Sequence, residues 1–496
     1  MATAVYTPSW TIPGPRPLPF IGRTINVFRY ISDPIGHASR LFKQYGRIVS
    51  LAEGGGTNVF SPYDTPGTIF VYGPELIRQA RTPHERWNLP PLTGPLYPLD
   101  QPPPRKATLK HFLARPWGLD GEEHRAQRKL VLPAFHHKRI AAYRDDMVAI
   151  TQSVLDTWHL GTIIDVPEQL RHLTARVATK TLFGEDSIED SGSAGRTLQH
   201  AITTLSKPLT TLLPYDVPGL PYRRFLDLLP RFDAQMRAII QRKRATGHDD
   251  GDVLSMLLHA RDEESNAALA EEEVIAWVGS LFGAGHETSS LALTWTLLLL
   301  SQHPHITADL VDELTGTLQG DPPTLDHLRP DAGHLPLLEA VVKESLRILP
   351  PAPMTWRLAA HATELGGYDI PQGAEVYGSI YHTHHMPELY SEPERFNPRR
   401  WETINPSAWE YIPFNAGPRM CIGASFALME IKIVLAMLLQ RFRMQFVPKA
   451  PIDRYGIITT GPKYGLPMIV HPQDRRFDHG VGGVRGNVRE MVQLPE

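Results

Sequence analysis

The sequence predicts a mainly α fold with small β sheets, and three patterns lead to this prediction. Residues 270–303 contain no proline and carry long apolar stretches, which is typical of one central helix of roughly 50 Å. Residues 140–250 look helical apart from a few breaks, and residues 424–439 form an apolar run with few helix breakers. Short strands are indicated at residues 48–52 and 68–72, between Gly- and Pro-rich turns.

The N-terminal part is predicted to form a strap, a helix and a long loop. Residues 1–34 are rich in proline and contain neither a basic segment nor an apolar run, so we expect no signal peptide and no transmembrane anchor. Residues 33–46 are typical of a short helix that Gly46 ends. Residues 82–118 are rich in proline and lack periodicity, and a loop of that length is usually functional.

The second half is predicted to alternate helices with short hairpins. Residues 335–348 are typical of an amphipathic helix, and residues 368–377 carry a hairpin signal. Residues 473–496 are polar and Gly-rich, so we expect a loosely held C-terminal tail.

Composition excludes several classes of site. The chain has 496 residues, a net charge of −3 and one cysteine. A single cysteine rules out an intramolecular disulfide, a cysteine-ligated iron–sulfur cluster and a multi-thiolate zinc site within the chain. The near-neutral charge gives no indication of nucleic acid as a partner.

That cysteine, Cys421, lies in a glycine-rich loop in front of the apolar run, in the pattern Phe414-x-x-Gly417-x-Arg419-x-Cys421-x-Gly423. A thiol at a helix N-terminus, with a cation two residues before it, is expected to favour thiolate. A lone thiolate on such a loop suits one axial bond to heme iron. The alternative is a buried structural cysteine, which is the commoner fate of a single cysteine.

The centre of the predicted long helix reads Ala284-Gly285-His286-Glu287-Thr288-Ser289. A glycine, an acid and two hydroxyl residues lower helix propensity there, and such local inconsistency indicates a functional position. A bulge at Gly285 would leave room for dioxygen, the Thr288 hydroxyl could hold a water, and Glu287 could relay protons. The alternative is a kinked core helix with satisfied hydroxyl groups.

The loop around Cys421 matches in full the heme-binding loop of the cytochrome P450 family, the heme-thiolate monooxygenases, and the helix centre resembles that family's oxygen-activation motif. The resemblance covers about residues 35–472 and is closest to soluble bacterial members. It implies one large domain, mostly α with small sheets on one side, that binds one heme b.

The resemblance also implies residue roles. It makes Cys421 the axial iron ligand, gives Thr288 and Glu287 control of proton delivery, and places His124 where the family commonly has tryptophan. The residues implied to contact the cofactor are His124, Arg128, Ala284, Arg357, Phe414, Gly417, Arg419, Cys421 and Gly423. The residues implied to line the substrate pocket are Leu281, Phe282, Ala284, Met354, Thr355 and Ile458. Those implied to form a structural triad behind the heme are Glu344, Arg347 and Arg395.

The function implied by the resemblance is monooxygenation of a lipophilic substrate such as a fatty acid or terpenoid, by hydroxylation or epoxidation. Because the chain has no flavin or ferredoxin domain of its own, electrons would come from a ferredoxin or flavodoxin-type donor with its reductase. We expect a cytoplasmic monomer. The alternatives are a peroxide-dependent peroxygenase or an isomerase of the same family, against which the Glu287-Thr288 pair argues, and a non-catalytic heme sensor or carrier, for which the sequence shows no output module.

Overall fold

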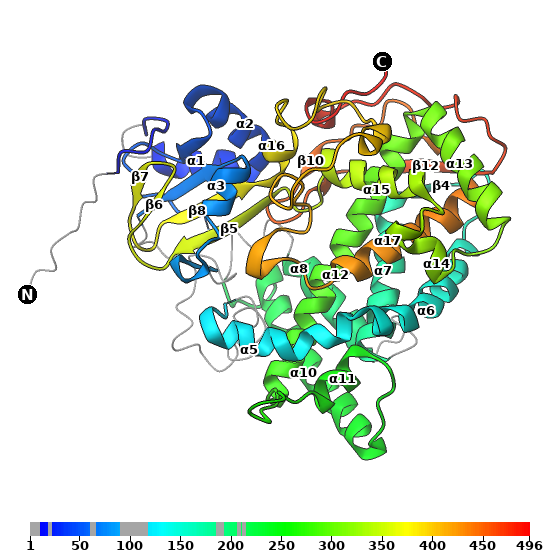
Figure 1. The fold of residues 1–496 in the computed structure, drawn as a ribbon, viewed down its shortest axis with the longest axis horizontal. Coiled ribbons are helices and arrows are strands. Elements are labelled where there is room, and N and C mark those ends of the chain that lie inside the picture. The colour runs from blue at the N-terminus through cyan, green and yellow to red at the C-terminus, as the bar shows by residue number, and fades with distance from the viewer. Residues whose placement is uncertain are drawn as a thin grey trace, which may run out of the picture.

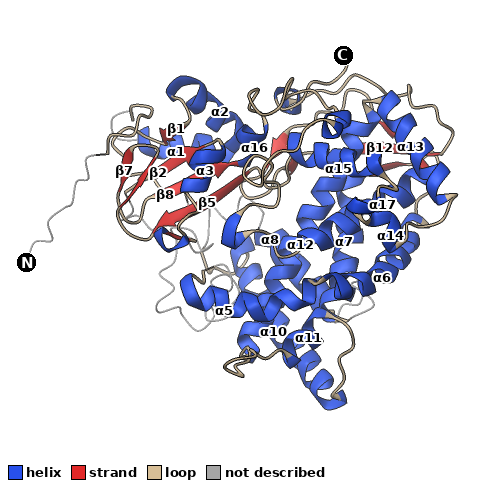
Figure 2. Cartoon of the chain, viewed as in Figure 1, coloured by secondary structure: helices blue, strands red, loops and turns tan. Residues whose placement is uncertain are grey.

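The computed structural model describes residues 10–17, 22–59, 66–89, 118–184, 193–205, 210 and 215–496. Over these residues the fold is mainly helical, with the largest sheet and helices α1 to α3 at one side of the helical part (Figures 1 and 2). The predicted fold class is therefore confirmed.

The helices are α1 (Gly22–Ser32), α2 (Pro34–Tyr45), α3 (Pro74–Gln79), α5 (Gly121–Val131), α6 (His137–Leu155), α7 (Val166–Phe183), α8 (Ala194–Leu205), α10 (Pro221–Thr246), α11 (Val253–His259), α12 (Glu271–Ser301), α13 (Pro304–Leu318), α14 (Leu325–Leu328), α15 (Pro336–Ile348), α16 (Ile380–His384) and α17 (Ala424–Arg441). The strands are β1 (Ile48–Ser50), β2 (Thr68–Val71), β3 (Trp87–Asn88), β4 (Ile163–Asp165), β5 (Met354–Ala359), β6 (Thr363–Leu365), β7 (Tyr368–Ile370), β8 (Glu375–Ser379), β9 (Phe442–Phe446), β10 (Arg454–Tyr455), β11 (Gly461–Pro462) and β12 (Pro467–Pro472).

Helix α12 is the central element of the helical part (Figure 1). It packs against α7, α15 and α17, and most of its residues after Glu273 are buried. A helix surrounded by other helices must be apolar on all sides, which explains its long hydrophobic run. The prediction of one long helix over residues 270–303 is confirmed.

The largest sheet has the strand order β1-β2-β8-β5-β3, and only β2 and β8 run parallel. The predicted strands at residues 48–52 and 68–72 are confirmed as the antiparallel pair β1 and β2. The predicted hairpin at residues 368–377 is wrong. Strand β7 pairs with β6, whereas β8 enters the large sheet between β2 and β5, so the two strands belong to different sheets.

The expected N-terminal strap contains a helix, because residues 22–32 form α1. Asp33 then caps α2, accepting a hydrogen bond from the Gly36 N–H at 3.1 Å. Residues 1–9 and 18–21 of the strap lie outside the described residues, as do residues 90–117 of the predicted loop at 82–118.

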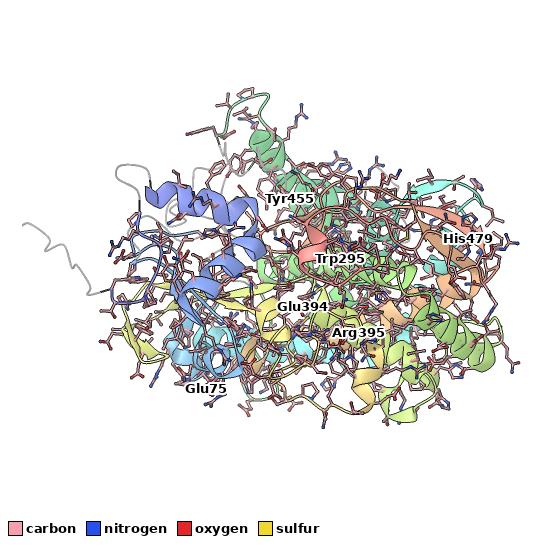
Figure 3. The ribbon with its side chains drawn as sticks, turned by 90° about the horizontal axis from the view of Figure 1, so that it is seen from above. Glu75, Trp295, Glu394, Arg395, Tyr455 and His479 are labelled. Carbon is pink, nitrogen blue, oxygen red and sulfur yellow. The ribbon has the colours of Figure 1, made fainter. Side chains whose placement is uncertain are left out.

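Residues 473–496 are packed on the core, so the expectation of a loosely held tail is wrong (Figure 3, where His479 marks this segment). Gln302, which ends α12, accepts a hydrogen bond from the Gly482 N–H at 2.7 Å and donates one to the Gly480 carbonyl at 3.2 Å. Burial of apolar side chains holds the rest of the segment. These side chains are Val484, Val488, Met491, Val492 and Leu494.

Arg454 joins three distant parts of the chain. Its guanidinium donates to the Asp33 carboxylate at 2.8 and 2.9 Å and to Glu490 at 2.7 Å. The buried guanidinium therefore links the start of α2, the β10–β11 hairpin and the C-terminal segment.

Candidate active site

The loop that presents Cys421 is shaped by glycine and closed by a main-chain bond. Gly417 adopts a φ of +74°, a left-handed conformation that favours glycine. The Cys421 N–H donates to the Phe414 carbonyl at 2.9 Å, which closes the loop just before α17 begins at Ala424. The predicted helix behind the cysteine is therefore confirmed, with the thiol in front of its first turn.

Cys421 is exposed, although protein atoms surround its thiol on most sides. Burial raises the pKa of its thiol, although the Gly423 N–H and the Arg128 guanidinium act in the opposite direction. The helix N-terminus thus acts in favour of thiolate, as expected, but in the protein alone the cost of burying the charge is larger. Coordination to a metal would itself deprotonate such a thiol.

One face of α12 is open in the middle of the helix. Ala284 is exposed and Thr288 is half-buried, whereas Phe282, His286 and Ser289 are buried. A Cβ atom built on Gly285 would meet no atom within 4 Å, so open space lies beside that residue. Helix α12 is nevertheless α-helical over its whole length, so the structure does not contain the expected bulge at Gly285.

The two predicted proton-handling residues already have protein partners. The Thr288 hydroxyl donates to the Ala284 carbonyl at 2.7 Å. Glu287 accepts a hydrogen bond from Arg171 of α7 at 2.8 Å, and both side chains are partly exposed. The sequence pattern did not indicate Arg171, because nothing in its own surroundings on α7 separates it from an ordinary surface arginine.

Four basic residues, which we call the cation cluster, lie on the side of the loop that faces α5 and β5. His124 of α5 is buried, and burial, reinforced by neighbouring arginines, lowers its pKa to about 3. Burial and the nearby Arg419 lower the pKa of Arg357 on β5 to about 10. Arg128, one turn after His124, donates to the Met420 carbonyl at 2.8 Å. The structure thus brings together the four basic residues that the resemblance assigned to a carboxylate-bearing cofactor.

Arg419 has a protein partner that the sequence did not indicate. It donates to Asp120 at 2.7 Å and also to the Leu119 carbonyl. Burial raises the pKa of Asp120 although the Arg419 cation acts against it. Asp120 therefore anchors Arg419 and compensates only part of the positive charge of the cluster.

The predicted pocket residues divide between opposite faces of their elements. Leu281 is half-buried on the same face of α12 as Ala284, three residues apart. Phe282 is fully buried and stacks on Phe183 of α7, with ring centroids 5.7 Å apart. Its assignment to the pocket is wrong, because a step of one residue turns a side chain about 100° around the helix.

Met354 and Thr355 cannot both face the pocket, because successive side chains on a strand point to opposite faces. The Met354 sulfur accepts a hydrogen bond from the buried Tyr30 hydroxyl at 3.6 Å, on the side of α1. Thr355 points to the other face, which also carries Arg357 two residues later. Met354 is therefore removed from the predicted pocket, and Thr355 lies on the side of the cation cluster. Ile458 is exposed between β10 and β11.

The cytochrome P450 family model matches residues 106–467. The chain belongs to the cytochrome P450 family. It is therefore an enzyme of a heme-iron monooxygenase family, whose members use O2 and electrons from redox partners.

Its relatives in the family include bacterial and plant enzymes. It is 34% identical to cyclooctat-9-en-7-ol 5-monooxygenase of Streptomyces melanosporofaciens, over 71% of this chain and 77% of the relative. It is 32% identical to pentalenene oxygenase of Streptomyces avermitilis, over 68% and 75% of the two chains. Cytokinin hydroxylase of Arabidopsis thaliana is 30% identical and is matched over 93% of this chain and 91% of its own length.

Solved cytochrome P450 structures share the fold over nearly the whole chain. Cyanobacterial CYP120A1 bound to retinoic acid has a TM-score of 0.76 and 26% identity, covering 93% of this chain and 99% of its own. The heme domain of cytochrome P450DA has a TM-score of 0.77 at 23% identity, which shows the fold alone. Within the described residues, no helix is both long and apolar enough to cross a membrane.

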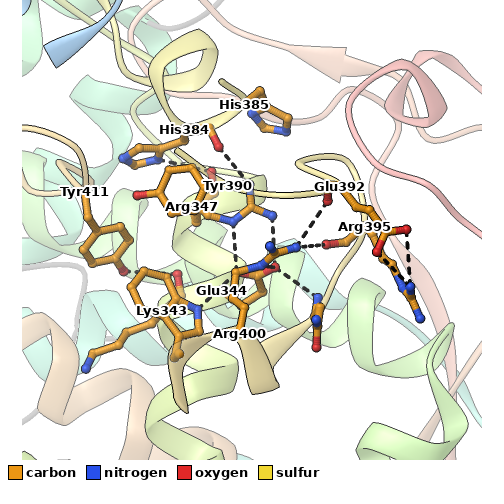
Figure 4. Close-up of polar contacts among 12 residues, drawn as sticks. Lys343, Glu344, Arg347, His384, His385, Tyr390, Glu392, Arg395, Arg400 and Tyr411 are labelled. Atoms are coloured by element: carbon orange, nitrogen blue, oxygen red, sulfur yellow. Dashed lines mark hydrogen bonds and ion pairs between the residues drawn. The ribbon is translucent and has the colours of Figure 1, made fainter. Parts of the chain in front are cut away.

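The structural triad of this cytochrome P450 contains Arg400 and not Arg395 (Figure 4). The fully buried Glu344 accepts two hydrogen bonds from Arg347 at 2.9 Å and one from Arg400 at 3.0 Å. Arg395 is mostly exposed and pairs with Glu392, three residues earlier. The prediction of Arg395 is wrong because Arg395 turns its guanidinium to solvent and contributes only its carbonyl, which accepts from Arg400 at 3.1 Å.

A buried acid, Glu430 of α17, was not indicated by the sequence analysis. It is 2% exposed, and burial raises its pKa from an ordinary 4.5 to about 8, while Ser289 of α12 acts in the opposite direction. Its place nine residues after Cys421, on a helix that packs against α12, could have drawn attention to it.

Glu430 should make the stability of the protein depend on pH. Between about 4.5 and 8 the folded state keeps the proton that the unfolded chain releases, so the free energy of unfolding should fall as pH rises. The slope from this group is at most about 1.4 kcal/mol per pH unit and vanishes above pH 8. Chemical unfolding of wild type and Glu430→Gln at pH 5 and pH 8 measures it.

The variant should gain stability relative to wild type as pH rises across that interval. Glu402→Gln, at an exposed position, is the matched control and should leave the difference independent of pH. An equal difference between wild type and Glu430→Gln at both pH values would contradict the assignment.

Proposed function

We propose that this enzyme binds heme b through Cys421 and inserts one oxygen atom from O2 into a lipophilic, terpenoid-like substrate. A ferredoxin or flavodoxin-type donor with its reductase supplies the electrons. The observation that carries the proposal is the position of the only cysteine, which is exposed and lies in front of a helix that packs against α12. Relatives named for oxidation of cyclooctat-9-en-7-ol and pentalenene support a terpenoid-like substrate.

The residues present fit heme. The thiol suits the iron, and the open space beside Gly285 gives a flat group access to α12. His124, Arg128 and Arg357 supply donors for two carboxylates, with Arg419 held beside them by Asp120. Heme bound there supplies the redox chemistry that activates O2.

Thr288 and Glu287 handle protons on the open face of α12. The Thr288 hydroxyl can turn from the Ala284 carbonyl to hold a water, because its side chain is only half-buried. Glu287 must exchange Arg171 for water before it passes a proton inward. Ala284, Leu281 and Ile458 offer the apolar surface that a lipophilic substrate would contact.

The Thr288→Ala variant should consume NADPH without matching product formation. Loss of the hydroxyl removes positioned proton delivery, so product yield should fall roughly 10²-fold at most while peroxide release rises. Simultaneous measurement of NADPH use, peroxide and product tests this. Thr288→Ser keeps the hydroxyl and is the matched control, and tight coupling in Thr288→Ala would remove the assigned role.

The proposed function is tested by the difference spectrum of the reduced protein with carbon monoxide, followed by spin-state titration with cyclic terpenoids. We expect the long-wavelength Soret band of thiolate-ligated heme and a shift on addition of a terpenoid. A short-wavelength band in the freshly reduced wild type would overturn the ligation. A thiolate band without any response to terpenoids would overturn the substrate class alone.

A further inference from the structure

Arg81, two residues after α3, is a buried cation outside the site described so far. It is 3% exposed and donates to the Ile77 carbonyl at 3.2 Å and to the Thr355 hydroxyl at 2.7 Å. Its Nε has no hydrogen-bond partner among the residues that the structure describes. A guanidinium has five N–H donors, so two neutral acceptors leave most of its capacity unused.

The place of Arg81 is fixed by the large sheet. Thr355 of β5 lies opposite Gly378 of β8, and a Cβ atom built on Gly378 would come within 3.5 Å of an Arg81 nitrogen. The guanidinium therefore lies directly against the strand at Gly378. Arg357 lies two residues beyond Thr355 and so shares its face of the strand, which places two buried arginines on one side of the sheet.

Among the described residues, Arg81 and Arg357 differ from the other buried cations in their lack of an ion-pair partner. Within the described parts of the chain, eight arginine and lysine residues are buried. Six of them form an ion pair with a carboxylate. Those six are Lys243, Arg347, Arg400, Lys432, Arg443 and Arg454. Arg81 and Arg357 are neighbours, and neither has a carboxylate of the described residues within ion-pair distance.

Two neighbouring cations without a carboxylate are unfavourable in a protein interior. Burial, reinforced by Arg357, lowers the pKa of Arg81 well below its ordinary value. The charge of Asp120 acts to raise the pKa of Arg357 without a hydrogen bond between the two. Asp120 instead accepts hydrogen bonds from Arg419 and from the Leu89 N–H. The arrangement thus lacks a negative charge that a bound anion would supply.

We propose that Arg81 and Arg357 together hold one carboxylate, contributed either by the heme or by an acidic substrate. The inference rests on the proposed function, and it adds Arg81 to the groups that position the ligands. A planar guanidinium with a free Nε side suits a carboxylate better than a neutral acceptor.

Two titrations separate the sources of the carboxylate. In the first, apoprotein of wild type and Arg81→Gln is titrated with hemin and with hemin dimethyl ester. In the second, the heme-loaded proteins are titrated with dodecanoic acid and with methyl dodecanoate, and the spin-state shift measures binding. Loss of one charge-assisted contact should weaken binding of the carboxylate form roughly ten- to a hundredfold and leave the ester unaffected.

A selective loss with hemin assigns the carboxylate to the heme, and a selective loss with dodecanoic acid assigns it to the substrate. Arg81→Lys should restore part of the affinity, because it keeps the charge. Arg443→Gln is the control for lost stability, because it removes a buried arginine of β9 that pairs with Asp474. Thermal unfolding of the two variant apoproteins confirms that they fold.

If wild type and Arg81→Gln show the same preference for the acid over the ester form in both titrations, the inference is overturned, provided that wild type shows the thiolate band with carbon monoxide. Absence of that band in wild type would instead overturn the proposed function, and the inference with it.

Discussion

The Cys421→Ala variant is expected to fold and to lose the thiolate spectrum and all turnover. The chain has no second cysteine, so no other thiol can replace the ligand. Because the side chain is small and exposed, its removal should change the free energy of unfolding of the apoprotein by no more than about 1 kcal/mol. The carbon monoxide difference spectrum and the rate of NADPH-dependent product formation measure the two losses.

Met420→Ala is the matched control for this variant. Met420 is the preceding residue, its side chain is exposed, and only its carbonyl contacts Arg128, which the substitution leaves in place. The control should keep the thiolate band. An unchanged spectrum in Cys421→Ala would show that another residue ligates the iron.

Replacing Arg400 by alanine should lower the free energy of unfolding by about 3–5 kcal/mol, because it leaves Glu344 short of a buried partner. Glu344 is fully buried and also accepts hydrogen bonds from Arg347, the Asn397 N–H and the Trp401 indole. Arg400 itself donates hydrogen bonds to three carbonyl groups, those of Ser391, Glu392 and Arg395. Its loss would therefore disturb the carboxylate and the loop around it (Figure 4).

The same substitution at Arg395 should change the free energy of unfolding by no more than about 0.5 kcal/mol, because an exposed ion pair contributes little. Urea unfolding of the two variants side by side measures the contrast. Equal destabilisation by Arg395→Ala and Arg400→Ala would mean that the structure assigns the wrong arginine.

The Cys421 loop and the motif at the centre of α12 were predictable because the residues of each lie close together in the sequence and contact one another. Cys421 is tied to Phe414 within one loop, and Thr288 to Ala284 within one turn. Arg400 was not predictable from spacing, because it lies in the short 3₁₀ helix Pro398–Glu402, where no repeating pattern selects it over Arg395. Arg81 was missed for a related reason, since only the sheet reveals that it is buried beside Arg357.

Other errors contradict patterns that were visible in the sequence. Strand alternation alone separates Met354 from Thr355. The spacing of Val484, Val488 and Val492 at four-residue intervals already indicated one apolar face in the C-terminal segment. The raised pKa of Cys421 was hidden, because burial is set by the assembled helices and not by the loop.

The junction at Arg454 has a consequence for the rate at which the chain can fold. Arg454 lies 421 residues after its partner Asp33 and 36 residues before its partner Glu490. Contacts between such distant segments slow folding, because a long loop must close before they form. Helix α2 therefore stays unattached to the β10–β11 hairpin until the loop of 421 residues between Asp33 and Arg454 has closed.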